Sequence, residues 1–205
     1  LLALQAALHS MNDLRRLAWD LSLFTTSEFD FVVLPREYTT GSSIMPNKSN
    51  PDVVELLRGR AATVAAASAE IQSVLSLPSG YQRDLQLTKA PLIRGFRVAL
   101  QSLAIVPALV QGLQFREERM HGAISPEMFA TDRALEQAAR GVPFRTAYRD
   151  AKQQPGAAQG MNAADSLARR VSPGACANLM LERIHQRLER QLERACRARP
   201  DNHQW

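Results

Sequence analysis

The sequence predicts an all-α fold, in which a long-helix bundle is followed by a small helical C-terminal domain. Apolar residues recur every three or four positions over long stretches, which is the period of an amphipathic helix. Alternating β-branched residues are scarce, and only Phe29–Leu34 (FDFVVL) suggests a short extended piece. With 205 residues, 45% apolar and 22% charged, the chain can bury a sizeable core.

The first helix is predicted from one apolar stripe near the start of the chain. Its residues are Leu4, Leu8, Met11, Leu14, Ala18 and Leu21. The N-terminal stretch that contains it, LLALQAALHSMNDLRRL, does not begin with Met and lacks the basic start and the small-residue cleavage site of a signal peptide. We therefore expect the chain to enter a helix partway and to be part of a longer protein.

Two further long helices are predicted from their boundaries. Asn50 is expected to cap the second helix, with Pro51 in its first turn and Asp52 at its positive end. This helix should run to about Ser76, and a third should span residues 91–113.

Shorter helices are predicted beyond residues 114–124. We place a domain boundary in this region, which gives one domain at residues 1–115 and another at residues 116–205. Proline and glycine mark the ends of these helices. The expected markers are Ser125-Pro126 at a start, Gly141 at an end, Pro143 at a second start and Ser172-Pro173 at the start of the last helix. Residues 153–162 are predicted to be a flexible connection.

Charge and cysteine content narrow the class of protein. The net charge of +5 comes largely from arginines near the C-terminus, which we interpret as a solvated helix face and not as a nucleic-acid patch. Charged residues are expected to break the apolar runs short of a membrane span. Cys176 and Cys196, if on one continuous helix, would lie roughly 30 Å apart, too far to pair. Unpaired cysteines fit a cytoplasmic location.

The stretch GSSIMPNKSNP, residues 41–51, interrupts the helical pattern with two adjacent serines, a lysine and two prolines, and is the segment best suited to hold a ligand. We call it the signature loop. A phosphate-binding P-loop is excluded, because Asn47 stands where glycine is needed and Pro46 lacks an amide hydrogen. The composition suits removal of a proton beside a carboxylate instead. A serine can act as the base only where amides and cations stabilise its anion, and Lys48 supplies such a charge.

The signature loop matches G-S-S-x-M-P-x-K-x-N-P, and therefore resembles the fumarase/aspartase superfamily, whose members form fumarate by β-elimination. Other segments resemble the argininosuccinate lyase family within it, over residues 1–150. These are FTTSEFDFVVLPREYTTGSS, LPSGYQRDLQ, SPEMFATD and GVPFRTAY. The resemblance implies a C–N lyase that cleaves argininosuccinate to arginine and fumarate, in arginine biosynthesis.

The resemblance also implies roles for individual residues. Ser42 corresponds to the catalytic base, with Ser43 beside it among the substrate-binding residues. Lys48 and Asn50 hold the substrate carboxylate, and Glu55 pairs with a catalytic histidine. Tyr81, Gln86 and Lys89 match a Y-x-x-x-x-Q-x-x-K pattern that binds substrate. Without the signature, Glu55 would be interpreted as a first-turn acid and Tyr81 as a packing aromatic.

Two segments of the family pattern are missing from the sequence: the Thr-His segment that supplies the catalytic histidine and an Asn-containing segment. The four histidines, His9, His121, His185 and His203, lie in none of the family's contexts and lack metal-ligand spacing. The chain therefore resembles the C-terminal portion of such a lyase. The resemblance further implies a homotetramer whose active sites each draw on three subunits. No metal and no cofactor are expected.

Two alternatives stay open at this point. The first is a sister lyase acting on another succinyl substrate, such as adenylosuccinate, aspartate or malate. The second is a helical assembly module without catalysis, since the chain lacks the histidine segment. The set Ser42, Lys48, Asn50 and Glu55 favours an enzyme, and Tyr81, Gln86 and Lys89 favour argininosuccinate.

Overall fold

The computed structural model describes residues 1–76, 82–154 and 161–197. The chain divides into two compact units, Leu1–Met120 and His121–Trp205, and each is described by itself.

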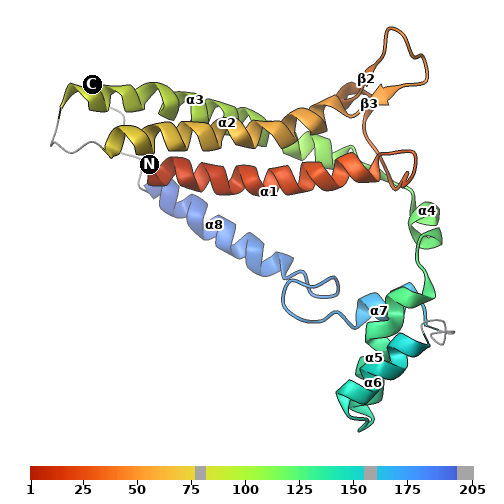
Figure 1. Cartoon of the computed structure of the whole chain (residues 1–205). Helices are drawn as coiled ribbons and strands as arrows, with labels where there is room; N and C mark the ends of the chain where they lie inside the picture. The colour runs from red at the N-terminus through yellow and green to blue at the C-terminus, as the bar shows by residue number, and fades with distance from the viewer. Residues whose placement is uncertain (77–81, 155–160, 198–205) are drawn as a thin grey trace. The chain divides into compact units, whose positions relative to one another are not determined.

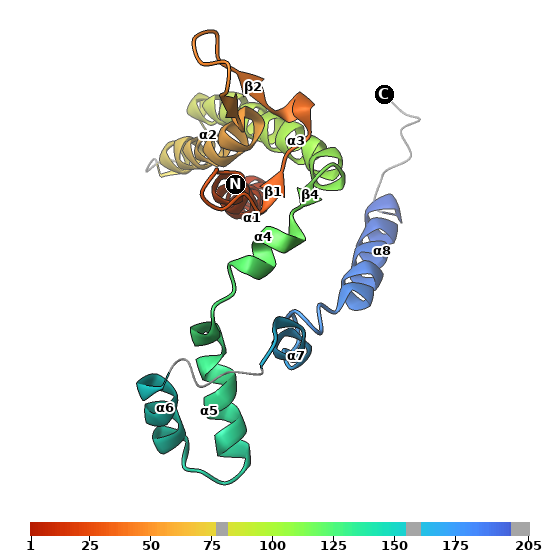
Figure 2. The same ribbon diagram turned by 90° about the vertical axis from the view of Figure 1, so that its right-hand side faces the viewer.

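Three long helices form the first unit. They are α1 (Leu2–Phe24), α2 (Asp52–Leu75) and α3 (Lys89–Gln111), which pack on one another with successive helices running in opposite directions (Figures 1 and 2). The predicted stripe of the first helix is confirmed: Leu4, Met11, Leu14, Ala18 and Leu21 are buried, and Leu8 packs against them. On α2 the buried residues are Val54, Leu57, Ala61, Val64, Ala67, Ser68 and Ile71. The all-α prediction is therefore correct.

Small residues allow the helices to approach closely. A Cβ added to Gly95 of α3 would lie 2.6 Å from Cδ1 of Leu4 and 3.3 Å from Cβ of Ala67, so α3 meets both α1 and α2 there. At the end of α3, a Cβ on Gly112 would lie 2.4 Å from Cγ of Pro35. A larger residue at either position would therefore force a neighbouring side chain to shift.

A short two-stranded connection joins the segment after α1 to the segment after α3. Strand β1 (Val32–Val33) pairs antiparallel with β4 (Gln114–Phe115), so the extended piece expected near residues 29–34 is present but only two residues long. Beside it, Asp30 has a positive φ of 48°, and its carboxylate lies 3.1 Å from Nε of Arg116. Helix α4 (Glu117–Gly122) follows. The sequence pattern predicted neither β4 nor α4.

The signature loop forms a β-hairpin at the end of the bundle where α2 begins (Figure 1). After the 3₁₀ turn η1 (Arg36–Tyr38), strand β2 (Thr40–Gly41) pairs antiparallel with β3 (Ser49–Asn50). The expected start of α2 was wrong in detail. Asn50 lies in β3 and does not cap the helix; Pro51 is the N-cap residue, without a side-chain hydrogen bond. The ladder uses Asn50 as a strand residue, which prevents it from capping.

The second unit contains a pair of packed helices. After the 3₁₀ turn η3 (Pro126–Phe129), α5 (Ala130–Ala139) packs on α6 (Phe144–Gln153) through alanines 134, 147 and 151. Helix α7 (Ala163–Ala168) is tied to α5 by a buried carboxylate: Asp132 accepts a hydrogen bond from Ser166 Oγ at 2.5 Å and lies 2.9 Å from Nη2 of Arg170. The predicted ends at Pro126, Gly141 and Pro143 are consistent with these bounds.

The last helix, α8 (Leu181–Arg197), has no buried residue. Its predicted start at Ser172-Pro173 was wrong, because residues 172–177 form turns and Met180, directly before the helix, has a positive φ of 55°. Cys176 therefore does not share a helix with Cys196, although both are free. The arginine-rich face is exposed, as the sequence predicted.

The expectation about membrane spans needs a correction. The stretch Arg83–Gln111 is long and apolar enough to cross a bilayer by length and composition alone. However, Gly95, Ala99, Ser102 and Leu109 of α3 are buried, and α3 packs against α1 and α2. Only 22% of the apolar window is buried in this way, so the bundle covers one side of α3 and leaves other apolar residues exposed.

We predict that Gly95→Ala lowers the free energy of unfolding by about 1–3 kcal/mol, because the added methyl group must displace the buried Leu4 side chain. The matched control is Gly59→Ala on α2, where nothing lies within 4 Å of the new Cβ. The control should be stabilising by about 0.5–1 kcal/mol through helix propensity alone. Urea denaturation of the two variants measures both values. Equal effects of the two substitutions would refute the close contact.

Candidate active site

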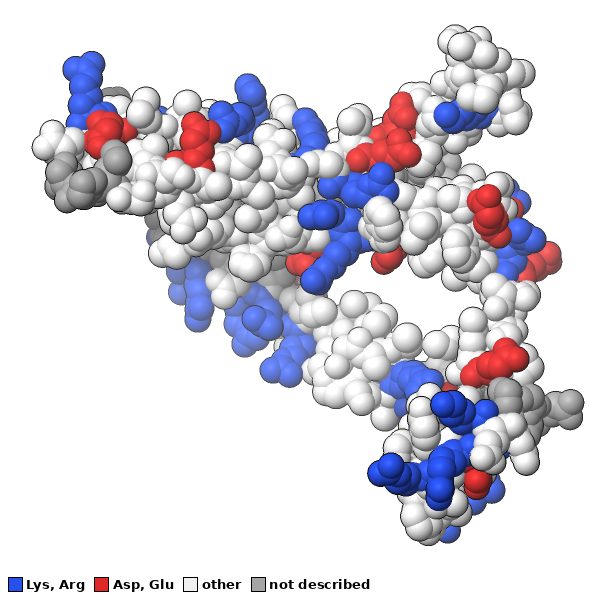
Figure 3. All heavy atoms as spheres, viewed as in Figure 1, with Lys and Arg blue, Asp and Glu red and all other residues white. Residues whose placement is uncertain are grey.

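The hairpin of the signature loop projects from the bundle with little packing of its own. Residues 43–49 are all exposed, and Ile44 has 87% of its surface accessible. Figure 3 shows the projection as mostly uncharged, with acidic side chains where it joins the bundle. The hairpin has only two ladder pairs, Thr40 with Asn50 and Gly41 with Ser49. Its conformation therefore depends on local hydrogen bonds.

The hydroxyl of Ser42 is the centre of these local bonds. The backbone N–H groups of Ile44 and Met45 both donate to Ser42 Oγ, at 3.2 Å and 3.1 Å. The turn is closed by Lys48 N–H, which donates to the carbonyl of Met45 at 3.1 Å. Two amide donors directed at one serine oxygen favour its anionic form, because hydrogen bonds to a charged acceptor are about twice as strong as those to a neutral one. None of the other serines and threonines in the described residues accepts two backbone amides in this way.

The strand register decides which side chains share a face of the hairpin. Thr40 faces Asn50 and Gly41 faces Ser49, and the ladder ends there, so Ser42 and Lys48 are the first residues beyond it on either side. Directly opposed residues point to the same side of a ladder, and alternate residues along a strand share a side. Thr40 and Asn50 therefore share one face of the ladder, while Ser42, Ser43 and Lys48 belong to the turn beyond it.

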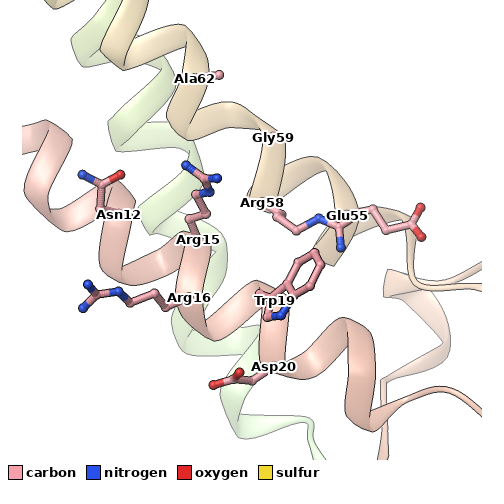
Figure 4. Close-up of a pocket in the computed structure, with 9 residues that line it drawn as sticks. All are labelled: Asn12, Arg15, Arg16, Trp19, Asp20, Glu55, Arg58, Gly59 and Ala62. Carbon is pink, nitrogen blue, oxygen red and sulfur yellow. The ribbon is translucent and has the colours of Figure 1, made fainter. Parts of the chain in front are cut away.

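Glu55 lies in the first turn of α2, close in sequence to the base of the hairpin, and is exposed. It borders an open groove of about 1110 Å³ between α1 and α2. The other lining residues are Asn12, Arg15, Arg16, Trp19, Asp20, Arg58, Gly59 and Ala62. The Arg58 guanidinium lies 4.9 Å from the centre of the Trp19 ring, while the Glu55 carboxylate points away from that ring (Figure 4). The Glu55 carboxylate is therefore accessible to a group from another segment or from a second chain.

The remaining predicted residues lie at the other end of α2. Gln86 is in the 3₁₀ helix η2 (Arg83–Thr88), and Lys89 is the first residue of α3; both are exposed. Tyr81 lies outside the described residues. Since α2 has 24 residues, its two ends are about 35 Å apart. One chain therefore brings Ser42, Lys48, Asn50 and Glu55 to one end of the bundle and leaves Gln86 and Lys89 at the other.

Two features of the site were not predicted from the sequence. The amides that donate to Ser42 are backbone groups, which every residue except proline has, so no residue type in the sequence indicates them. The second feature is a hydrogen bond from the Thr40 hydroxyl to the carboxylate of Asp52, which joins β2 to the first residue of α2. In the part of the chain that the structure describes, no three His, Cys, Asp or Glu side chains gather as metal ligands.

Comparison with curated proteins identifies close relatives. Residues 1–66 match a family model described as "Lyase". The argininosuccinate lyase of Xylella fastidiosa (strain 9a5c) is 56% identical over 188 residues, which cover 91% of this chain and 42% of that protein. The argininosuccinate lyase of Sorangium cellulosum (strain So ce56) is 56% identical over 187 residues, covering 91% of this chain and 44% of that protein. The chain therefore spans less than half the length of these relatives.

Solved structures share the fold at lower identity. An EDDS lyase variant with bound fumarate matches with a TM-score of 0.63 and 19% identity, over 94% of this chain and 46% of that one. A class II fumarase from Schistosoma mansoni matches with a TM-score of 0.62 and 20% identity, over 74% of this chain and 32% of that one. At this identity the likeness concerns the fold alone.

We predict that Ser42→Ala loosens the turn even in the absence of any ligand, because two amides lose their acceptor. Amide hydrogen exchange at Ile44 and Met45, measured by NMR, should be faster by about twofold to tenfold, the effect of a hydrogen bond of about 0.5–1.5 kcal/mol. Ser43→Ala is the matched control and should leave exchange at both amides unchanged. The same acceleration in both variants would contradict the assignment of Ser42 as the acceptor.

Proposed function

We propose that this chain, a sequence of the argininosuccinate lyase family in the fumarase/aspartase superfamily, supplies the serine loop of a C–N lyase that cleaves argininosuccinate to arginine and fumarate. The observation that carries the proposal is the pair of amides donating to Ser42 Oγ. The 56% identity to two argininosuccinate lyases supports the substrate class. Because the chain matches 42–44% of their length, the proposal concerns a longer subunit of which it forms a part.

The proposed chemistry is a β-elimination. Ser42, as its anion, removes a proton from the carbon next to a substrate carboxylate, and negative charge develops on the carboxylate oxygens. Lys48 and Asn50 lie on the strand side of the hairpin opposite Ser42, directly beyond and within the short ladder, so they are suited to hold that carboxylate. The positive end of α2 begins just after Asn50 and favours the same charge. The C–N bond then breaks, the electron pair leaves with the nitrogen, and fumarate forms.

The separation of the predicted residues supports a site shared between chains. A succinyl substrate is far shorter than the distance of about 35 Å between the two ends of α2. For Ser42 and Gln86 to contact one substrate molecule, they must come from different copies. Exposed apolar residues on the long helices, such as Ile93 and Leu100 of α3, favour burial against another copy. The resemblance to the superfamily extends this to a proposed homotetramer, acting in the cytoplasm, with the histidine that pairs with Glu55 supplied by another segment or subunit.

A sister lyase on another succinyl substrate is the second candidate. Gln86 and Lys89 are both exposed, three residues apart at the junction of η2 and α3, and so can act together on a substrate. Their match to the argininosuccinate pattern favours argininosuccinate over adenylosuccinate, aspartate or malate. Turnover of these four substrates by the assembled enzyme would separate the candidates.

We predict that Ser42→Ala in a subunit of full length lowers kcat by at least about 10³-fold, as expected for loss of a catalytic base together with its anion. KM should change little, because Lys48 and Asn50 remain to bind the carboxylate. Steady-state release of fumarate, followed by its ultraviolet absorbance, gives both values. The matched variant Ser43→Ala should lose much less, since the two backbone amides donate to Ser42 and not to Ser43. Equal losses in kcat would refute Ser42 as the base.

We predict that the 205-residue chain alone associates but is inactive, because it contains no Thr-His segment. Mixed with a full-length Ser42→Ala subunit, it should restore some activity, since it contributes the serine loop. Mixed with a full-length subunit that has lost its catalytic histidine, it should restore none. Light scattering measures the association. A monomer at micromolar concentration, or lyase activity from the chain alone, would overturn the proposed assembly.

A further inference from the structure

We propose that Thr40 and Asp52 form a positioning pair that fixes the base of the hairpin to α2 and thereby places Ser42. The proposal rests on the function proposed above for Ser42. The Thr40 hydroxyl donates to a carboxylate oxygen of Asp52, twelve residues further along the chain. Neither residue belongs to the catalytic set that the signature implies.

The pair joins the least packed part of the unit to the most firmly packed one. The hairpin is exposed from Ser43 to Ser49 and is held by two ladder pairs, and short isolated hairpins are marginal in water. Helix α2 is anchored two and five residues after Asp52 by Val54 and Leu57, which are 0% and 1% exposed. A hydrogen bond between β2 and the first residue of α2 therefore restricts the movement of the hairpin relative to the helix.

The pair also lies on the side of the hairpin that carries the proposed chemistry. Thr40 is directly opposite Asn50 in the ladder, so these two share a face, and Ser42 follows Thr40 by two residues. Asp52 and Glu55 are three residues apart on α2 and lie on neighbouring positions of the helix surface. Fixing Thr40 to Asp52 consequently sets the direction in which Ser42 leaves the strand relative to Glu55.

A simpler role for Asp52 is an acid that stabilises the positive end of the helix. That role needs no partner on β2, and it would make Thr40 irrelevant to turnover. The two roles differ in their dependence on the Thr40 hydroxyl, which is therefore the group to test. Thr40→Val keeps the branched shape of the side chain and removes only the donor. Its exposed position leaves the core of the unit intact.

The chain offers a matched control one residue away. The Thr39 hydroxyl donates to the carbonyl of Arg36 at 2.9 Å, a local bond within η1 that does not reach α2. Thr39→Val therefore removes one threonine hydroxyl and one hydrogen bond without affecting the connection between hairpin and helix. Thr40→Ser restores the donor, and Asp52→Asn keeps an acceptor without its charge.

The test uses two independent measurements. In the 205-residue chain, NMR amide exchange at Ile44 and Met45 should accelerate in Thr40→Val, stay at the unmodified rate in Thr39→Val and Thr40→Ser, and be intermediate in Asp52→Asn. In the assembled full-length enzyme, Thr40→Val should lower kcat by about tenfold to a hundredfold, the cost of a small misplacement of a reacting group, with KM and the thermal unfolding temperature nearly unchanged.

Unchanged amide exchange in Thr40→Val would overturn the positioning role, as would equal losses of kcat in Thr39→Val and Thr40→Val. Failure of Thr40→Ser to recover the turnover would overturn it too. The exchange measurement does not depend on turnover, so it tests the role of the Thr40–Asp52 pair independently of the proposed function. If the unmodified enzyme cleaved no succinyl substrate, the proposed function would fall while the exchange rates still decided whether the pair holds the loop.

Discussion

The packing of α2 between α1 and α3 is the constraint on which the rest of the first unit depends. Val54, Leu57 and Val64 are buried on α2, and each such side chain contributes about 1.5–3 kcal/mol. The hairpin contributes two ladder pairs and no buried residue, so it cannot hold its own shape. The position of the hairpin is therefore determined by the start of α2, to which it is joined. The same helix, through its length, also separates the hairpin from Gln86 and Lys89.

The long helices were predictable because burying one side of a helix requires apolar residues at a regular spacing in the sequence. Burial of one side of α1 needs apolar residues at helical spacing, and Leu4, Met11 and Leu14 display that spacing directly. The strands are only two residues long, which is too short for an alternating pattern to be recognised. Asp30 takes a positive φ beside Arg116, and such single-residue conformations depend on tertiary contacts. Asn50 was misassigned as a cap because its position in a ladder overrides its local preference.

The candidate site was predictable in its residues and not in its arrangement. The signature identified Ser42, Lys48 and Asn50, because a long fixed pattern ties residue types to positions. It does not reveal that the amides of Ile44 and Met45 surround the Ser42 oxygen, since backbone groups are the same in every residue. It also does not reveal that Gln86 lies far from Ser42, because 43 intervening residues are compatible with contact until a straight helix occupies most of them.

The length of α2 constrains how copies must assemble if the proposed function holds. A substrate that contacts Ser42 of one copy and Gln86 of another needs the hairpin end of the first α2 beside the far end of the second. Two such helices must then run antiparallel where they are neighbours, which brings both pairs of ends together at once. Close approach requires small side chains on the exposed side of α2, and Gly59, Ala62 and Ala66 are exposed there at helical spacing. The same helix that holds the hairpin in one chain would thus also determine which end of a second chain completes the site.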